Sequence, residues 1–555
     1  MSMRRRRPPV ADAGPFDAMM RPMAGARQTT GMPIRTAGGT PTGVAGPVSI
    51  DVLAVAGCLR DLPGLAVLDS ARAGRRSRWT YVTADPIAVV TRVGPPGATF
   101  GPARALLARM GGRARVVVPA HAGARGGEAA RPSDAAMGSD DDRDVPPFTG
   151  GLVGFVGYDV GRELERLPSV ALADQSLPLL SLALHDWVVA VDRREGGVLL
   201  CGRPVDGDQA RLEARLAEVR ERLAAAGPGD GMAGAARPAS GPDVAGDLRF
   251  TSGLSRDAWI DRVQRIREAI AAGELYQANL ARRLEAPFAG DPWPVFRALR
   301  TGDPATFAAY LDLGRASPMD APVPSGVQDS SGASGASGSP DVAAGPRAIV
   351  SASPEPFLSV DAHGRVETDP IKGTRPRGLT RAEDRALAAE LLASEKDRAE
   401  NVMIVDVLRN DLGRVCRPGS VRVPRLCRLE RTAAVQHLVS TVVGRLMPGH
   451  DALDLIAAAF PGGSITGAPK IRAMRLIEEI EPVRRGPYCG TALWLGPDGA
   501  LGSSILIRTF VADGRRLTLH VGGGITRRSD PAEEWEETRA KARGPLRAIG
   551  AEEDG

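Results

Sequence analysis

Lys372 is the residue of this sequence whose type and surroundings most strongly suggest chemistry. It lies in the stretch Asp369-Pro-Ile-Lys-Gly-Thr-Arg-Pro-Arg-Gly378, whose prolines and glycines predict a constrained loop. Arg375 and Arg377 are like charges that would lower the pKa of a neighbouring amine, and a neutral amine can act as a nucleophile whereas arginine cannot. Only four of the 71 basic residues are lysine. A nucleophilic lysine is therefore indicated, with an ordinary surface lysine as the alternative.

The C-terminal segment is predicted to place two carboxylates and a lysine on one face of a helix. Pro531 suits the first helical turn, where its missing N–H is tolerated. Glu534, Glu537 and Lys541 follow at spacings of three and four residues, so they share a face. Two carboxylates one turn apart can hold a hard cation such as Mg²⁺. Acids also gather at a helix start because the helix dipole favours them there.

Glu355 and two glycine-rich stretches are further candidates for a site. Glu355 lies between two prolines after an expected strand, and such a rigid position suits a general acid, although glutamates in exposed turns are common. Val521-Gly-Gly-Gly-Ile525 and the stretch from Phe460 to Lys470 offer bare backbone that could donate N–H groups to an anion. Neither stretch matches G-x-G-x-x-G or G-x-x-x-x-G-K-[ST], so ATP and NAD sites are not supported.

A mixed framework of helices and strands must position these residues. Helical spacing predicts helices over 209–225, over 256–272 after the N-cap Ser255, and over 395–411, which contains Glu400. A strand is expected from Gln277. Residues 310–312 and 348–350 are expected strands of one hairpin, whose long connection is tolerated because the entropy of closing a loop grows slowly with its length.

Composition divides the 555 residues into folded and unfolded parts. Segments 1–47, 121–146, 226–246 and 317–346 have almost no large apolar residues, so they cannot bury a core. We expect a disordered arm (1–47), an N-terminal region (48–225), a linker (226–246) and a catalytic domain (247–547) that carries the 317–346 insertion.

The charge, the cysteines and the apolar content exclude several classes of protein. A net charge of +5 and 4% aromatic residues argue against nucleic-acid binding, although the tail Arg4–Arg7 keeps an arginine-rich binding protein as a remote alternative. Five widely spaced cysteines without a CxxC pair support neither disulfides nor structural zinc. Because no run of about 18 apolar residues and no apolar signal segment occur, a cytoplasmic protein without a membrane partner is expected.

Taken together, these motifs resemble the chorismate-utilising enzymes, a family that contains anthranilate synthase component I, aminodeoxychorismate synthase component I, and the isochorismate and salicylate synthases. The resemblance runs from about residue 50 to 545 and is strongest after residue 251. The stretches that carry it are Gly273–Asn279, Ser353–Phe357, Pro370–Arg375, Ala399–Asn401, Arg409–Gly413, Gln436–Ser440, Gly463–Lys470, Ser504–Arg508 and Gly522–Lys541.

The resemblance implies a fold and a role for each candidate residue. The fold would be α+β and chorismate-binding, with packed antiparallel sheets, surrounding helices and an active site in a cleft. Glu400, Glu534 and Glu537 would hold Mg²⁺ against a substrate carboxylate, and Glu355 would be the general acid that protonates the departing C4 hydroxyl. The residues implied to bind the substrate are His437, Ser464, Tyr488, Arg508, Gly522 and Lys541. Related enzymes also carry a tryptophan pocket near a segment like Leu68-Asp69-Ser70.

Two positions indicate the branch of the family. Synthases that add water carry a lysine where this chain has Gln277, so isochorismate and salicylate formation are disfavoured. Lys372 lies in Pro-Ile-Lys-Gly-Thr, which is typical of aminodeoxychorismate synthases, whereas anthranilate synthases usually have alanine there. The expected reaction is amination of chorismate to 4-amino-4-deoxychorismate, a precursor of p-aminobenzoate and folate, through a covalent bond to Lys372. Anthranilate synthesis, which serves tryptophan formation, is the alternative.

Ammonia for this reaction needs a source. No segment of the chain resembles a glutamine amidotransferase, and no cysteine has the surroundings of a glutaminase nucleophile. A separate glutamine amidotransferase subunit is therefore the expected partner, beside chorismate itself.

Overall fold

The computed structural model describes residues 51–72, 77–95, 97–117, 145–225, 248–315, 345–432 and 435–554. Its contacts divide the chain into Met1–Gly46 and Pro47–Gly555, and all the elements below belong to the second unit. The expected arm 1–47 and linker 226–246 lie outside the described residues, as do all but the last two residues of 121–146 and of the 317–346 insertion. No helix in the described ranges is both long and apolar enough to cross a membrane.

A 13-stranded sheet is the larger of two sheets, and within the described residues its neighbouring strands are antiparallel except for β23 and β9. The strands in spatial order are β23 (Glu552–Glu553), β9 (Arg249–Ser252), β10 (Gln277–Pro287), β22 (Arg516–Ile525), β21 (Thr509–Asp513), β12 (Pro346–Ser353), β11 (Phe307–Arg315), β1 (Ala66–Asp69), β2 (Trp79–Thr83), β7 (Trp187–Asp192), β8 (Gly197–Gly202) and β4 (Arg115–Val117), with β18 (Gly467–Ala468) beside β10.

The second sheet has ten described strands, all antiparallel to their neighbours. In spatial order they are β15 (Ile371–Pro376), β17 (Val435–Arg445), β14 (Arg365–Thr368), β13 (Pro356–Val360), β20 (Leu501–Ile505), β19 (Thr491–Leu495), β5 (Gly151–Val156), β6 (Leu180–His185) and β3 (Ala88–Val90), with β16 (Arg422–Arg431) paired to β17. Strands from 48–225 and from 247–547 occur in both sheets, so the two sequence regions build one framework.

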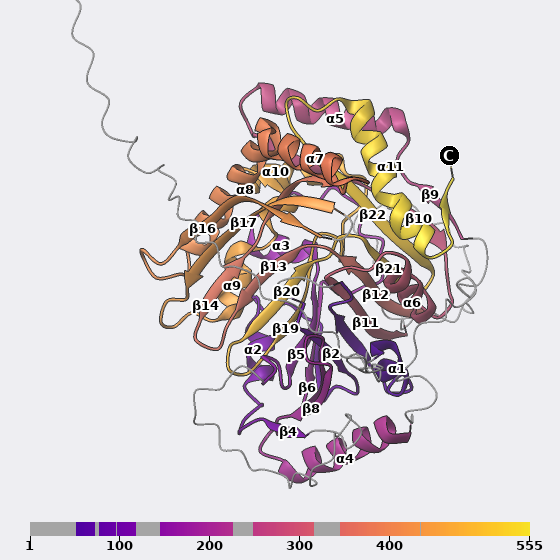
Figure 1. Ribbon diagram of the computed structural model, residues 1–555, viewed down its shortest axis with the longest axis vertical. Helices are drawn as coiled ribbons and strands as arrows, with labels where there is room; N and C mark the ends of the chain where they lie inside the picture. Colours follow the sequence, from indigo (N-terminus) through magenta and orange to yellow (C-terminus); the bar gives the residue numbers. More distant parts are fainter. Residues whose placement is uncertain are drawn as a thin grey trace, which may run out of the picture. The chain divides into compact units, whose positions relative to one another are not determined.

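Figure 1 shows the sheets and the helices that cover them. The alternation of buried residues along a strand shows which layer each side chain faces. Along β7, Val188 and Ala190 face the second sheet, while Val189 and Val191 face helices on the other side, as period-two strands require. Helices on that outer side are α1 (Val52–Gly57), α4 (Gln209–Ala225) and α6 (Trp293–Gly302). The second sheet packs with α2 (Gly101–Leu107), α8 (Glu395–Gly413) and α9 (Ala452–Ala459). The architecture is therefore α+β, as expected.

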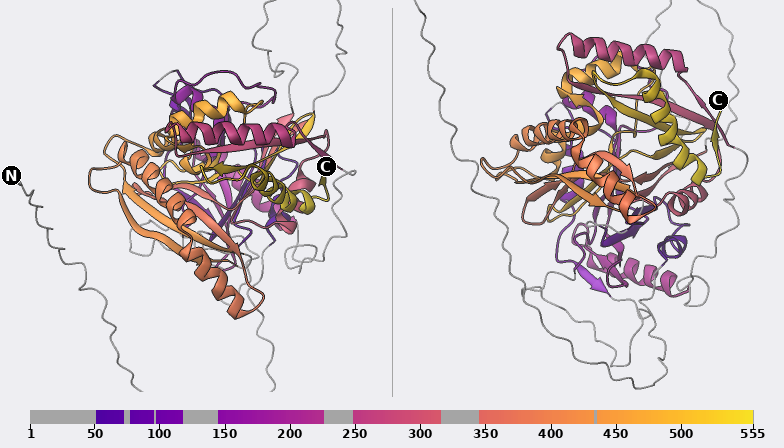
Figure 2. Two further views of the ribbon diagram at one scale, coloured as in Figure 1. Left: turned by 90° about the horizontal axis from the view of Figure 1, so that it is seen from above. Right: turned by 45° about the horizontal axis from the view of Figure 1, so that its top comes forward.

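Three helices cover the β10–β22 end of the larger sheet (Figure 2). They are α5 (Arg256–Ala271), α10 (Lys470–Ile480) and α11 (Pro531–Ala548). Trp259 of α5, Leu476 of α10 and Trp535 of α11 share one apolar cluster with Leu280 of β10. This cluster fixes α10 and α11, whose residues contribute to the site, against the strands.

Several sequence predictions are confirmed and one is wrong. The helices predicted at 209–225, 256–272 and 395–411 are present, and the predicted hairpin pairs Tyr310 with Val350. The stretch around Lys372 is not a loop, because its backbone forms β15 and pairs with β17. This strand has a bulge between Lys372 and Thr374, where Gly373 has a φ of 79°. A helix, α7 (Arg381–Ala393), follows this strand and packs against it.

Candidate active site

Lys372, Glu355 and Ser464 come from three elements and meet at one point. β15 carries Lys372, the connection from β12 to β13 carries Glu355, and the 3-10 turn η3 (Gly463–Ile465) carries Ser464. The Lys372 ammonium donates to the main-chain oxygen of Ser464 at 3.2 Å, and the side chains of Lys372 and Ser464 both lie close enough to Glu355 to act on its carboxyl group. Burial raises the pKa of Glu355, against the opposing effects of the Lys372 charge and the Ser464 hydroxyl. An amine and a carboxyl group whose pKa is raised by burial thus lie together.

The arginines expected to act on Lys372 are engaged elsewhere. Arg375 forms ion pairs with Glu390 and Asp397, at 2.8 Å and 3.3 Å. Arg377 binds Asp384 at 2.6 Å. The like charges inferred from the sequence are therefore compensated by carboxylates, because helices α7 and α8 pack against β15.

β22 and α11 bring Gly522, Glu534, Glu537 and Lys541 together. Lys541 Nζ donates to the Gly522 carbonyl at 2.8 Å and pairs with Glu537 Oε1 at 2.7 Å. A Cβ atom at Gly523 would lie 3.2 Å from Glu534 Oε2 and 3.7 Å from Glu537 Oε1. Both carboxylates of the predicted helix face therefore lie against the bare backbone of Gly523, where even a Cβ atom would make a tight contact with Glu534.

The carboxylates of α8 and α11 belong to one electrostatic cluster. Burial raises the pKa of Glu400, although the charges of Lys372 and Lys396 oppose the shift. Burial also raises the pKa of Glu534. Burial acts in the same direction on Glu537, but Lys541 and the other nearby lysines outweigh it, so the pKa of Glu537 is lowered. The three predicted metal ligands are thus held in a field of lysine charges.

The same three carboxylates fit Mg²⁺ in part. Carboxylate oxygens are hard ligands of the kind that Mg²⁺ prefers, and Glu534 and Glu537 face the same backbone position. Within the ranges that the structure describes, no three His, Cys, Asp or Glu side chains come close enough to hold a metal ion together. In the described arrangement, Lys541 takes one oxygen of Glu537.

His437 and Arg508 lie near the edge of this group. The Thr374 hydroxyl on β15 hydrogen-bonds to His437 Nδ1 on β17 at 2.9 Å. Burial lowers the pKa of His437 to about 4, and Arg508 adds to the effect, so the ring is neutral at pH 7. The Arg508 side chain is 45% exposed, and its one described ion pair, with Asp303, has a distance of 3.8 Å. Arg508 is therefore open to an anionic ligand.

Tyr488 is the most enclosed of the predicted substrate-binding residues. It is 4% exposed, and its ring stacks on His520 of β22 with centroids 4.9 Å apart and an interplanar angle of 10°. Burial raises the pKa of Tyr488 well above its usual value. In the described residues its side chain has no hydrogen bond or ion pair to another predicted site residue, and its burial comes from packing on β22.

A groove of about 1190 Å³ runs along α8 beside the predicted site. Glu400, Lys396 and Gln277 line it, together with apolar side chains such as Met403. Gln277 is 1% exposed, and neither of its amide atoms has a hydrogen-bond partner among the described residues. The sequence analysis did not predict Lys396 as a site residue. Two features could have indicated it: lysine is rare in this chain, and Lys396 lies one helical turn before Glu400.

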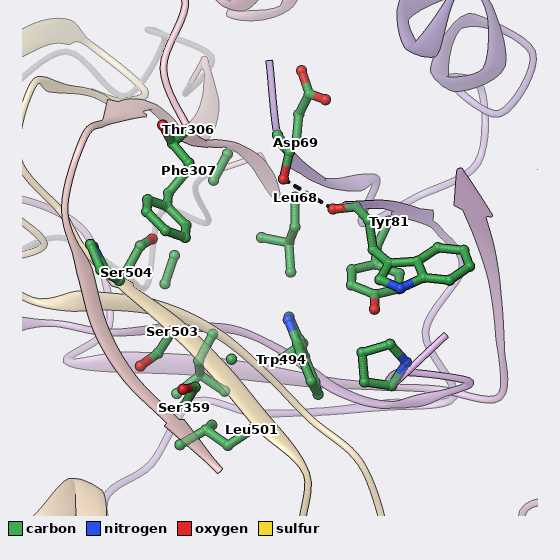
Figure 3. Close-up of a pocket in the computed structure, with 18 of the residues that line it drawn as sticks. Leu68, Asp69, Tyr81, Thr306, Phe307, Ser359, Trp494, Leu501, Ser503 and Ser504 are labelled. Carbon is green, nitrogen blue, oxygen red and sulfur yellow. Dashed lines mark hydrogen bonds between the residues drawn. The ribbon is translucent and has the colours of Figure 1, made fainter. Parts of the chain in front are cut away.

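A second cavity, of about 430 Å³, lies between the two sheets (Figure 3). Leu68 and Asp69 of β1, Phe307 of β11 and Trp494 of β19 line it. Asp69 is fully buried and is held by Arg300 at 2.5 Å, so its charge is compensated. The cavity lies at the segment where the resemblance implies a tryptophan pocket.

Comparison with known proteins shows the family of this chain. A family model described as chorismate binding enzyme matches residues 101–321 and 333–547. The chain belongs to this family. The fold expected from the resemblance is thus confirmed, and the chain is a chorismate-utilising enzyme.

Relatives of two kinds within the family are equally similar to this chain. It is 40% identical to anthranilate synthase component 1 of Streptomyces coelicolor over 408 residues, which cover 73% of this chain and 74% of the relative. It is 39% identical to aminodeoxychorismate synthase component 1 of Klebsiella aerogenes over 395 residues, which cover 71% and 75%. The crystal structure of anthranilate synthase component I from Streptococcus pneumoniae matches with a TM-score of 0.65 and 26% identity, over 85% of this chain and 93% of that one.

Proposed function

We propose that this chain is aminodeoxychorismate synthase component I, which converts chorismate and ammonia to 4-amino-4-deoxychorismate for p-aminobenzoate and folate synthesis. The observation that supports this choice is the meeting of the Lys372 amine with Glu355 at Ser464. A lysine nucleophile serves the aminodeoxychorismate branch, and a protonated carboxyl group beside it can assist departure of a hydroxyl group.

The reaction would proceed in two displacements. Lys372 Nζ attacks C2 of chorismate while Glu355 gives its proton to the C4 hydroxyl, which leaves as water. Ammonia then adds at C4, the bond between C2 and the lysine nitrogen breaks, the Lys372 amine is released, and the added nitrogen returns a proton to Glu355. The raised pKa of Glu355 favours the protonated form that the first step needs. Chorismate and ammonia thus give aminodeoxychorismate and water.

The remaining residues would bind the dianionic substrate. Glu400, Glu534 and Glu537 would hold or contact Mg²⁺ once their side chains come closer together than in the described arrangement, and the ion would supply a positive charge to a substrate carboxylate. The exposed guanidinium of Arg508 and the Lys541 ammonium would bind carboxylate oxygens. Contacts to the ring and its substituents would come from His437, Ser464, Tyr488 and Gly522.

Anthranilate synthesis is the second candidate, because a relative of that name is 40% identical. Both assignments need ammonia, and the relatives of both kinds are named component 1. We propose that a separate glutamine amidotransferase subunit supplies the ammonia to this chain.

Product identification separates the two candidates. The purified chain is incubated with chorismate, Mg²⁺ and an ammonium salt at alkaline pH, and the products are identified by mass spectrometry. We expect a product that retains the enolpyruvyl group and carries an amine in place of the hydroxyl. Anthranilate with pyruvate would assign the chain to tryptophan synthesis instead.

Two variants test the role of Lys372 in the same assay. Lys372→Ala removes the amine, and Lys372→Arg keeps the positive charge without a usable nucleophile. Loss of product by both variants, on the order of 1000-fold, is expected for covalent chemistry. Activity retained by Lys372→Arg would mean that the residue acts only as a cation.

A further inference from the structure

Arg485 is a fully buried charge directly behind the predicted site. Its side chain is 1% exposed, and its guanidinium donates to both carboxylate oxygens of Glu481, at 2.9 Å and 2.6 Å. The ring of Tyr158 lies against it, with its centroid 4.7 Å from the guanidinium carbon. A charge in such surroundings is tolerated only because it is paired and hydrogen-bonded.

The same guanidinium joins elements that are far apart in the sequence. Nη1 donates to the carbonyl of Ile465 in η3 at 2.9 Å, and Nη2 donates to the carbonyl of Asn279 in β10 at 2.9 Å. Glu481, at the end of α10, accepts the N–H of Ala281 in β10 at 2.9 Å. The rigid fork of donors on arginine therefore fixes the turn η3 relative to β10 and α10.

The turn held in this way carries the contacts of both reacting groups. Ile465 directly follows Ser464, whose carbonyl accepts from Lys372 and whose side chain lies close enough to Glu355 to lower the pKa of its carboxyl group. Any movement of the Ile465 carbonyl would shift both contacts at once. Displacements of about 1 Å away from the reacting atoms can cost about 100-fold in rate.

We propose that Arg485 and Glu481 form a positioning clamp, which sets the Ser464 turn and through it the distance between Lys372 and Glu355. This inference rests on the proposed function, because that function gives Lys372 and Glu355 their chemical roles. Both residues are positioning residues, because their hydrogen bonds go to the framework. A pair that served stability alone would leave kcat unchanged in every variant that folds.

Two variants and one control test the clamp. Glu481→Gln combined with Arg485→Met removes both charges, so no unpaired charge stays buried. Arg485→Lys keeps the charge beside Glu481 but cannot reproduce the planar fork. The control is Arg484→Met, which removes the adjacent arginine, a partly exposed residue that donates to Ser169.

The assay follows the loss of chorismate with ammonium, so it does not depend on which product forms. Relative to the wild type, we expect kcat to fall about 100-fold in the double variant and about 10-fold in Arg485→Lys. KM should stay within about threefold, because the substrate contacts remain. Arg484→Met should match the wild type.

Hydrogen exchange supplies a readout that needs no activity. Amides of 463–468 should exchange faster in both clamp variants, while those of the distant helix α4 should not change. A kcat within about twofold of the wild type in a folded variant, or unchanged exchange in the turn, would overturn the clamp. If the double variant fails to fold, the kcat and the hydrogen exchange of Arg485→Lys test the clamp. A wild type that leaves chorismate unchanged would refute the proposed function, and the exchange measurement would still decide the clamp.

Discussion

Two ion pairs attach to the same place on the β10–β22 ladder and differ in their exposure. Ala281 of β10 pairs with Gly522 of β22; the Ala281 N–H binds Glu481, and the Gly522 carbonyl binds Lys541. The side chains of the Arg485–Glu481 pair are 1% and 5% exposed, whereas those of Lys541–Glu537 are 43% and 54% exposed. Since water weakens the open pair, the buried pair can fix the framework and the open pair can exchange its partner for a ligand.

The largest expected effect comes from breaking the buried pair on one side. Glu481→Gln leaves the Arg485 charge enclosed without a counter-charge, so the free energy of unfolding should fall by about 3–5 kcal/mol. Urea unfolding followed by circular dichroism measures the change. Glu479→Gln, two residues earlier on the exposed side of α10, should change it by less than about 0.5 kcal/mol. If Glu481→Gln and Glu479→Gln lowered the free energy of unfolding by similar amounts, burial would not explain the importance of the Arg485–Glu481 pair.

Glu355→Gln tests whether Glu355 is the general acid of the reaction. Loss of the general acid should lower kcat by about 100-fold to 10000-fold, while KM for chorismate changes little. Steady-state rates with ammonium measure both quantities, and Glu221→Gln on the outer helix α4 is the control. A variant with unchanged kcat would remove Glu355 from the proton transfer.

The same substitution should stabilise the fold, in a direction fixed by the pKa. Burial raises the pKa of Glu355, so the ionised carboxylate opposes folding once the pH exceeds its unfolded value of about 4.3. Glu355→Gln should therefore unfold at a higher temperature than the wild type at pH 8, and the gap should narrow toward pH 4.5. Calorimetry across this range measures it. A variant less stable than the wild type at pH 8 would mean that the carboxylate is stabilised in place.

The sequence predicted local elements better than the contacts between them. Helices such as α5 and α11 carry their own signals, since Ser255 and Asp530 cap them as local rules require. Lys372 was predicted to lie in a loop, because its glycines and prolines outweighed a strand that exists only through pairing with β17. Strand pairing is a long-range property that one segment does not encode.

The candidate site shows the same limit. The local sequence pointed to Lys372 and Glu355, and the resemblance added Ser464; the structure bonds Lys372 to Ser464 and brings both close enough to act on Glu355. Arg485 was missed because one arginine among so many has no distinguishing mark. The only local signal is Glu481 four residues earlier, a spacing that also occurs on exposed helices. Its burial and its bonds to Ile465 and Asn279 arise from folding alone.

The smallest expected effect on stability comes from the open Lys541–Glu537 pair. A substitution there should weaken substrate binding while it leaves the free energy of unfolding almost unchanged. Lys541→Met removes one partner of Glu537, yet the free energy of unfolding should change by less than about 1 kcal/mol, because both side chains are exposed. KM for chorismate should rise about 10-fold, since a charge-assisted contact to a carboxylate is lost. Steady-state kinetics and urea unfolding on the same preparation give both values. Destabilisation as large as that of Glu481→Gln would show that the open pair also belongs to the framework, and the contrast between the two pairs would fail.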